Sequence, residues 1–345
     1  MGTKNTLLIG FEPNNPDLAN PQADAADRAR IYPVVEELKR RGVNVEIVAP
    51  ETRVTLRVSA RRSRLWEPRR EKKEEFWIFD VSDSILTPPN LGLLRNFWFE
   101  VKVRPQLVRY LRTCDLVVAG SEVQSAHFSS YVRSCTIPDV AIYLDQADSS
   151  LQAKVTAQPK SLTFGWDGQG LNFPFLEQLV RDNIGFFRRE DVKLLVVTDR
   201  RDSLRGVDNE ALLRSLRVNS EFRVWDRHTY MRDIGEALVG LAPLDLACPF
   251  ASAKPENKVI AYMSQGMSVV CAATQAYSNV ALRNPAVRDC KTAADWRESL
   301  EYFYQNRDDI VELGMQAHHF ARQHYSAERV ADRWIDVFRS FNLNV

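Results

Sequence analysis

Short apolar runs alternate with longer amphipathic stretches along most of the chain. In the first half the runs are Thr6–Phe11, Val43–Ala49, Phe76–Val81, Asp115–Ala119 and Asp139–Leu144. In the second half they begin at Leu162 and continue with Val192–Thr198, Phe222–Trp225, Ala237–Leu244 and Ser268–Ala273. Such runs are typical of strands buried on both faces, and the amphipathic stretches between them suit crossover helices. The pattern therefore predicts an α/β fold with parallel, doubly wound sheets.

The amphipathic stretches contain proline at places that affect the helices. A helix is expected over Asp24–Arg41, where Pro33 should kink it, and another over Gly92–Arg112, which Pro105 interrupts. Further helices are expected over Ala293–Gln305 and Asp309–His324. A last helix has apolar side chains at helical spacing, namely Val330, Trp334, Val337 and Phe341.

The stretch Ala237–Tyr277 reads as strand, loop, helix and strand. Pro255 is suited to the start of the helix, and Gly266 is suited to the position just after its end. Lys258 falls in the first turn of this helix, beyond the carboxyl end of a strand. Free N–H groups and the helix dipole favour an anion there, and an ammonium group adds a point charge. The position predicts a phosphate or diphosphate site, and the alternative is a solvated lysine on a surface helix.

This stretch resembles the donor-binding segment of retaining, family 4-like glycosyltransferases of the GT-B fold. The similarity is carried by LVGLAPL and KPENKVIAYMSQGMSVV, and it covers most of residues 160–345. Lys258 stands at the position of the family's phosphate-binding lysine. The chain departs from the family at Ala253 and Ala261, where two glutamates are usual and the second holds the donor ribose.

The resemblance implies two Rossmann-like domains that face each other across a cleft. Residues 1–155 would form the acceptor-side domain and residues 160–325 the nucleotide-sugar domain, with 326–345 as a helix that packs back on the first domain. It implies a retaining, metal-independent hexosyltransferase that uses a UDP-sugar such as UDP-glucose, with no cofactor. The alternative, motivated by the two alanines, is a non-catalytic GT-B-like nucleotide-binding protein or partner subunit.

Candidate donor-binding residues lie at the expected strand ends and in the loops that follow them. Closely spaced glycines around Trp166 and Asp167 let backbone approach a ligand, although the GxGxxG order is absent. Trp225 can stack on a base or belong to the core, and we expect the core. The full donor-binding set is Gly10, Trp166, Gly168, Gln169, Asp199, Trp225, Asp226, Asn257, Lys258, Gln275 and Tyr277.

The acceptor is expected on the N-terminal side. Lys258, Asp80 and Asp83 are the candidate catalytic residues, and Glu12, Arg61, Arg62, Arg64 and Trp66 the candidate acceptor-binding ones. Residues 53–73 hold nine basic residues against two glutamates, a net charge of +7 in a chain of net +1. An anionic acceptor is one interpretation, either DNA, which makes DNA modification a candidate function, or an anionic lipid surface or lipid-linked glycan. A solvated loop is the other.

Composition limits the function classes. With 46 basic against 45 acidic residues among 345, overall charge selects no partner. The five cysteines form no CxxC, which favours buried, reduced thiols in a cytoplasmic protein. No histidine has metal-ligand spacing with a carboxylate, so no metal site is expected. No apolar run is long enough for a membrane span, and the N-terminus lacks the pattern of a signal peptide.

Overall fold

The computed structural model describes residues 7–15, 17, 24–61, 76–88, 92–144, 151, 154, 161–201, 206–343 and 345. The chain forms two compact units. The first comprises Met1–Ile142, Cys248–Pro255 and His324–Val345, and the second comprises Tyr143–Ala247 and Glu256–Gln323. The chain therefore returns to the first unit twice, once briefly between two strands of the second unit and once at its end.

The first unit contains a six-stranded parallel sheet in the order β2-β1-β3-β4-β5-β6. Its strands are β1 (Ile9–Glu12), β2 (Val45–Ile47), β3 (Leu56–Ser59), β4 (Phe76–Val81), β5 (Leu116–Ala119) and β6 (Ser134–Thr136). The winding direction reverses between β1 and β3, and ligands of doubly wound sheets bind beyond the carboxyl ends of strands at such a point.

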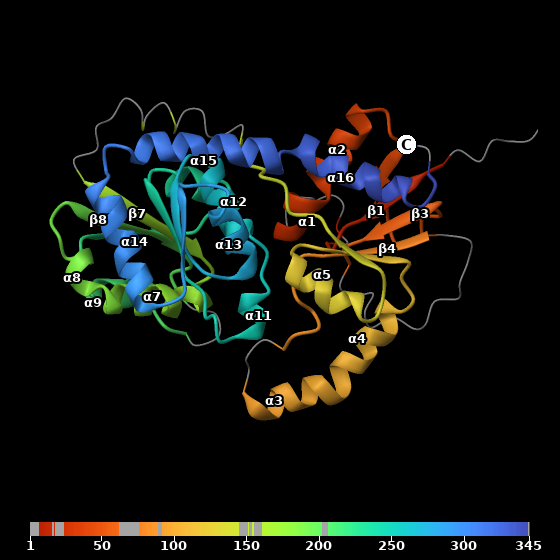
Figure 1. The fold of residues 1–345 in the computed structure, drawn as a ribbon. Coiled ribbons are helices and arrows are strands. Elements are labelled where there is room, and N and C mark those ends of the chain that lie inside the picture. The colour runs from red at the N-terminus through yellow and green to blue at the C-terminus, as the bar shows by residue number, and fades with distance from the viewer. Residues whose placement is uncertain are drawn as a thin grey trace, which may run out of the picture. The chain divides into compact units, whose positions relative to one another are not determined.

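Helices cover both faces of this sheet (Figure 1). The helices of the first unit are α1 (Ala25–Arg30), α2 (Tyr32–Arg40), α3 (Leu93–Trp98), the π-helical η2 (Phe99–Val103), α4 (Arg104–Leu111), α5 (Glu122–Ser129), the short α11 (Pro249–Ser252) and α16 (Ala327–Arg339). Successive residues of β4 face opposite sides of the sheet. Ile78 packs in a core cluster with α2 and α16, while Phe79 packs in another with α4 and α5.

The second unit contains a six-stranded parallel sheet in the order β12-β11-β10-β7-β8-β9. Its strands are β7 (Leu162–Gly168), β8 (Val192–Thr198), β9 (Ser220–Val224), β10 (Val239–Ala242), β11 (Ser268–Ala272) and β12 (Val287–Cys290). Counted from its own first strand, the order is 3-2-1-4-5-6, the dinucleotide-binding order of Rossmann folds, with its switch point between β7 and β10. The two units are thus Rossmann-like, as the sequence predicts.

The helices of the second unit connect these strands. They are η4 (Gly170–Asn172), a 3₁₀ turn, then α7 (Phe173–Asp182), α8 (Ile184–Phe187), α9 (Asn209–Ser215), α10 (Tyr230–Ile234), α12 (Asn257–Ser264), α13 (Gln275–Ala281), α14 (Ala293–Gln305) and α15 (Ile310–Tyr325). Gly266 follows α12 with φ +64°, in the left-handed region that glycine adopts at little cost, so it ends the helix as predicted.

Some sequence predictions are wrong in detail. Asp139–Leu144 is not a strand, and the sixth strand is the less apolar β6. The start of the basic stretch is β3 rather than a loop, and Arg57 on that strand is only 3% exposed. Pro33 does not kink one helix, because the chain breaks at Ile31 into α1 and α2 and the proline lies in the first turn of α2. The five cysteines are free and four are buried, as predicted.

Candidate functional site

The strands β7 and β10 part at the switch point of the second unit. They pair only at Val239 with Phe164 and at Gly240 with Gly165. Beyond these pairs the phenol of Tyr262 lies between the strands, since its oxygen accepts a hydrogen bond from the Asp167 N–H (3.1 Å) and donates one to the Leu241 carbonyl (3.2 Å). Gly240 makes room for this ring, because a Cβ there would stand 2.3 Å from it. Tyr262 thus holds the strand ends apart at the predicted ligand position.

Lys258 reaches this point from the first turn of α12. Its ammonium group donates a hydrogen bond to the Asp167 carbonyl and lies 3.7 Å from the Asp167 carboxylate. It also lies 5.2 Å from the ring of Trp166 and 5.9 Å from the ring of Tyr262, within the range of cation–π attraction. The side chain is 28% exposed, so the charge is held in place yet open to a ligand.

Gly168 ends β7 directly beside this ammonium group. A Cβ at Gly168 would lie 2.9 Å from the Trp166 ring and 3.3 Å from Lys258 Nζ. Trp166 is 2% exposed and belongs to the core, so it has little room to move away. The glycine is therefore required by the close approach of Lys258 to the strand end, and it leaves the backbone open to a ligand.

Asn257 precedes Lys258 on α12 and contains an unusual polar atom. Its Oδ1 is buried and has no hydrogen-bond donor within the part of the chain that the structure describes. Burying an acceptor without a donor costs about 1–3 kcal/mol, so such an atom needs an explanation. A bound ligand that donates a hydroxyl would provide one.

The loop after β7 is tied to the end of β8. The Gly170 N–H donates to the Asp199 carboxylate (3.1 Å), and the Thr198 hydroxyl donates to the Gly168 carbonyl (2.7 Å). Asp199 and Gln169 are both exposed. Two predicted donor residues, Gln169 and Asp199, therefore lie at the same edge of the sheet as Lys258.

The other predicted donor residues are more scattered. Trp225 is half-buried after β9 and packs against Tyr230, with ring centroids 5.3 Å apart, so the prediction that it belongs to the core is wrong. Asp226 is exposed and accepts the His228 N–H. Gln275 is exposed at the start of α13, whereas Tyr277 on the same helix is buried.

Gly10 lies in the first unit, inside β1. A Cβ at this position would come within 2.8 Å of Val48 and 2.7 Å of Val54. The glycine is therefore explained by packing of these side chains against the strand. Ala253, at the family's first glutamate position, is fully buried, and its carbonyl accepts a hydrogen bond from the Ser121 hydroxyl (2.9 Å). Ala261 is half-buried on α12.

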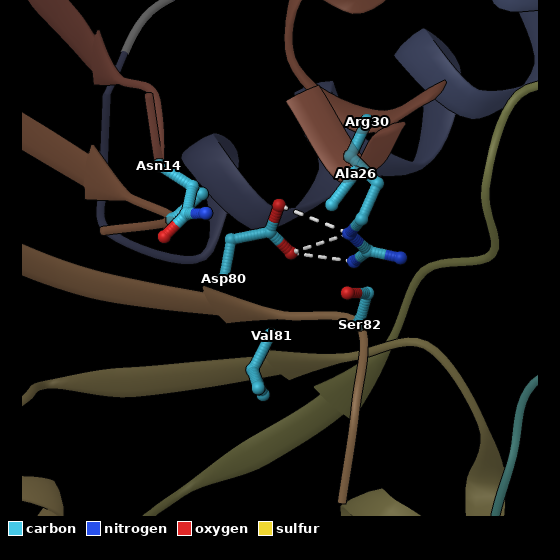
Figure 2. Close-up of a pocket in the computed structure, with 7 residues that line it drawn as sticks. Asn14, Ala26, Arg30, Asp80, Val81 and Ser82 are labelled. Atoms are coloured by element: carbon cyan, nitrogen blue, oxygen red, sulfur yellow. Dashed lines mark hydrogen bonds and ion pairs between the residues drawn. The ribbon is translucent and has the colours of Figure 1, made fainter. Parts of the chain in front are cut away.

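A small cavity lies at the switch point of the first unit. It is lined by Asn14, Ala26, Arg30, Ala60, Asp80, Val81 and Ser82. Figure 2 shows the Asp80 carboxylate turned toward the Arg30 guanidinium, whose Nε donates to both carboxylate oxygens at 3.1 Å. Arg30 Nη1 also lies 2.5 Å from Asp139. Asp80 thus lines the cavity as a buried carboxylate that is paired with Arg30, and it is not an exposed carboxylate.

Asp27 fixes the loop that borders this cavity. Its carboxylate accepts the backbone N–H groups of Asn14 and Asn15, both at 2.8 Å. Burial raises the pKa of Asp27 to about 6, against the lowering effect of these hydrogen bonds. Asn14, which lines the cavity, is therefore held by a carboxyl group whose pKa is raised to about 6.

The remaining acceptor-side candidates are divided by what the structure describes. Glu12 is buried and lies 3.4 Å from Arg57 and 3.6 Å from Arg61, so it takes part in a buried charge cluster. Asp83 is half-buried just after β4. Arg62, Arg64 and Trp66 lie outside the described residues.

Sequence reasoning missed several residues at both switch points. Arg30, Asp27 and Tyr262 are on helices whose apolar stripes masked them, and Asn14 belongs to a loop without a motif. A charged residue on an otherwise core-facing helix position is the signal that could have identified Arg30 and Asp27.

Solved structures resemble this chain over nearly its full length. It is similar over 97% of its length, and over 99% of the other chain, to sucrose-phosphate synthase from Thermosynechococcus elongatus, with a TM-score of 0.69 at 12% identity. A glycosyltransferase from Rickettsia africae gives a TM-score of 0.64 at 11% identity, over 99% of this chain and all of that one. HepE from Anabaena, solved with UDP-glucose, gives 0.61 at 12% identity over 97% and 100% of the two chains.

The chain has the GT-B fold. No protein-family model and no curated protein sequence matches it. The Rickettsia africae structure is a glycosyltransferase, and another similar structure, trehalose-6-phosphate synthase, catalyses glycosyl transfer with retention. Within the described residues, no helix has the length and apolarity to span a bilayer.

Proposed function

We propose that the protein transfers a sugar from a UDP-sugar to an acceptor hydroxyl, with the donor diphosphate at the carboxyl ends of β7 and β10. The observation that carries the proposal is the position of Lys258. It stands in the first turn of α12, at the switch point of a sheet with Rossmann order, in a chain of the GT-B fold. HepE, a neighbour of this chain, was solved with UDP and with UDP-glucose.

The charge at this point suits the chemistry of glycosyl transfer. When the bond from sugar to diphosphate breaks, the leaving diphosphate gains negative charge and the sugar gains oxocarbenium character. The Lys258 ammonium and the free N–H groups at the start of α12 stabilise that developing charge. Among the described residues, the ammonium contacts the Asp167 carbonyl, the Asp167 carboxylate and the rings of Trp166 and Tyr262, and a diphosphate is a stronger partner than any of them.

Asn257 offers an answer to the absent family glutamates. Asn257 and Ala261 are four residues apart on α12, so they share one helix face, and Ala261 is the position of the ribose-binding glutamate in the family. The buried Asn257 Oδ1 needs a hydrogen-bond donor. A ribose hydroxyl of the donor nucleotide supplies it in this proposal.

The acceptor is assigned to the first unit, at the β1/β3 switch point. A cavity of about 10 Å³, lined by Asn14, Arg30 and Asp80 among others, marks this position and has room for a water-sized group. Asp80 positions Arg30 there, and Asp83 follows at the end of the same strand as the candidate for the catalytic carboxylate. The prediction of an anionic acceptor, such as DNA or a lipid-linked glycan, comes from residues 53–73, of which 62–73 lie outside the described residues.

Turnover of UDP-sugars tests this proposal. We expect release of UDP from UDP-glucose or a related UDP-sugar, with retention of anomeric configuration in the product and unchanged rate in EDTA. UDP should also raise the unfolding free energy, by about 2.7 kcal/mol at a concentration 100 times its dissociation constant. UDP binding without turnover of any UDP-sugar would favour the non-catalytic alternative, which Ala253 and Ala261 motivate. Activity that is lost in EDTA and restored by Mg²⁺ would contradict metal independence.

A further inference from the structure

Four large apolar side chains are exposed on one short stretch of the first unit. Leu94 is 86% exposed, Phe97 69%, Trp98 60% and Val101 51%. They are spaced as i, i+3, i+4 and i+7, the spacing by which a helix normally gathers its core-facing residues. Here the same spacing presents them to solvent. Single exposed apolar side chains are normal on a protein surface, but a stripe of four needs an explanation.

The part of the chain that follows this stripe packs on the core of the first unit. Val103, Leu107 and Leu111 are buried in the core cluster beneath β4 and β5, and Phe99 packs against that cluster. These residues recur every four positions, so the core is already supplied by a second stripe. Figure 1 shows α3 running out beyond the sheet of its unit, with α4 leading back. We call residues 93–112 the α3–α4 arm.

Charge distinguishes the possible occupants of this face. The arm has five basic residues and one acid, Glu100, for a net charge of +4. Arg95 and Lys102 are exposed and adjoin residues of the apolar stripe in the sequence, Arg95 after Leu94 and Lys102 after Val101. A second copy of the chain would bring another +4 against it, which like-charge repulsion disfavours. A negatively charged surface complements it.

We propose that the α3–α4 arm binds the surface of an anionic lipid bilayer, with Leu94, Phe97, Trp98 and Val101 inserted among the headgroups and Arg95 and Lys102 on lipid phosphates. An apolar face containing Trp and Phe beside a basic face is the arrangement of helices that lie in the membrane interface. Trp favours the level of the headgroups, and each basic side chain adds electrostatic attraction to anionic lipid. Lipid contact through the arm does not require sugar transfer.

Cosedimentation of the full chain with vesicles tests this proposal. We expect binding to phosphatidylcholine vesicles that contain about a third phosphatidylglycerol, weakening as salt is raised, and no binding to pure phosphatidylcholine. Leu94→Ser and Trp98→Ser should each lower the partition coefficient about tenfold or more. Leu282→Ser is the matched control, because Leu282 is 85% exposed in the second unit, and it should change nothing.

The electrostatic part has its own pair of variants. Arg95→Gln with Lys102→Gln should lower partitioning by about fivefold per charge, while Arg329→Gln with Arg339→Gln removes the same net charge from α16 and should leave binding almost unchanged. An equal loss in both pairs would overturn the arm as the binding site, as would failure of the wild type to bind anionic vesicles. Self-association without lipid that Leu94→Ser abolishes, measured by ultracentrifugation, would instead assign the face to a second copy.

Discussion

At the scale of single residues, the candidate donor site depends on side chains that are held tightly but incompletely satisfied. Lys258 is fixed against Asp167 and Trp166, and Asn257 beside it has a buried oxygen without a donor in the described part of the chain. Such preorganised polar groups lose little conformational freedom when a ligand binds, so their interactions contribute more fully to affinity. These two adjacent residues therefore make separable predictions about the donor.

Asn257→Ala should remove the hydrogen bond to a ribose hydroxyl. We expect UDP to bind wild type more tightly than a deoxyribose analogue of UDP, by about 0.5–1.5 kcal/mol. In Asn257→Ala the two nucleotides should bind alike, because the acceptor that distinguishes them is gone. Calorimetric titration of both nucleotides measures this difference. A preference that persists unchanged in the variant would place the ribose elsewhere.

Lys154 predicts a pH dependence of stability. It is buried and donates to the Gln265 and Gly266 carbonyls at the end of α12, and burial lowers its pKa to about 7. The unfolded chain keeps a lysine pKa near 10.4, so between pH 7 and 10 the unfolded state binds the extra proton and stability rises with pH.

The comparison with Lys154→Met isolates this contribution. Relative to the variant, the wild type should gain up to about 1.4 kcal/mol of unfolding free energy per pH unit between pH 7 and 10, measured by urea unfolding. Below pH 7 the difference should level off, because both states of the wild type are then protonated. A difference that is flat from pH 6 to 10 would show that the pKa of Lys154 is ordinary.

Residue roles were only partly predictable from the sequence. Lys258 could be singled out because a helix start beyond a strand end has a fixed electrostatic meaning. Trp225 was misassigned to the core, since an aromatic residue at the end of an apolar run reads the same whether it ends the strand or leaves it. Tyr262 was missed because its role depends on β7 and β10 parting, which is a property of the sheet and not of the local pattern.

At the scale of elements, the Tyr262 hydroxyl bridges the ends of β7 and β10, where the two strands no longer pair through their backbones. Tyr262→Phe should leave the Asp167 N–H and the Leu241 carbonyl without their partner and cost about 1–3 kcal/mol of unfolding free energy. Tyr302→Phe is a suitable control, because its hydroxyl has no hydrogen bond within the described residues and should cost less. Equal urea midpoints for wild type and Tyr262→Phe would contradict this role.

Helix α16 belongs to the core of the first unit although it ends the chain. Trp334 is 1% exposed, and its ring lies 5.4 Å from that of Phe11 on β1. Trp334→Ala should therefore destabilise the protein by about 3–5 kcal/mol, and Arg333→Ala on the exposed side of the helix should be nearly neutral. Chemical denaturation of the two variants checks this. A small loss for Trp334→Ala would mean that α16 is only loosely packed.

Elements were predictable where one signal dominated. Phe76–Val81, Val192–Thr198 and Ala293–Gln305 are elements with the expected bounds, since apolar runs and helical periodicity are unambiguous there. β3 was hidden because Arg57 is buried against Glu12, a tertiary pairing that the local pattern does not reveal. The apolar residues of Gly92–Arg112 predicted a helix there, but a periodicity shows only that a helix has an apolar face and not what covers it.

At the scale of the whole molecule, the two sheets place one candidate site in each unit. Strand order predicts ligand positions between β1 and β3 and between β7 and β10. The first holds the cavity with Arg30 and Asp80, and the second holds Lys258. The alternation of strands and helices was enough to predict two such units. No local pattern indicates that Cys248–Pro255 groups with the first unit, because this grouping arises from long-range packing.

The central claim is that Lys258 binds the diphosphate of a nucleotide-sugar donor, and calorimetric titration of UDP tests it most directly. Lys258→Ala should weaken UDP binding by about 1.5–3 kcal/mol, roughly ten- to 150-fold, because a charge-assisted contact to phosphate is lost. Lys291→Ala removes an exposed lysine from the same unit and should bind UDP like the wild type. UDP affinity that is the same in wild type and Lys258→Ala would contradict the account.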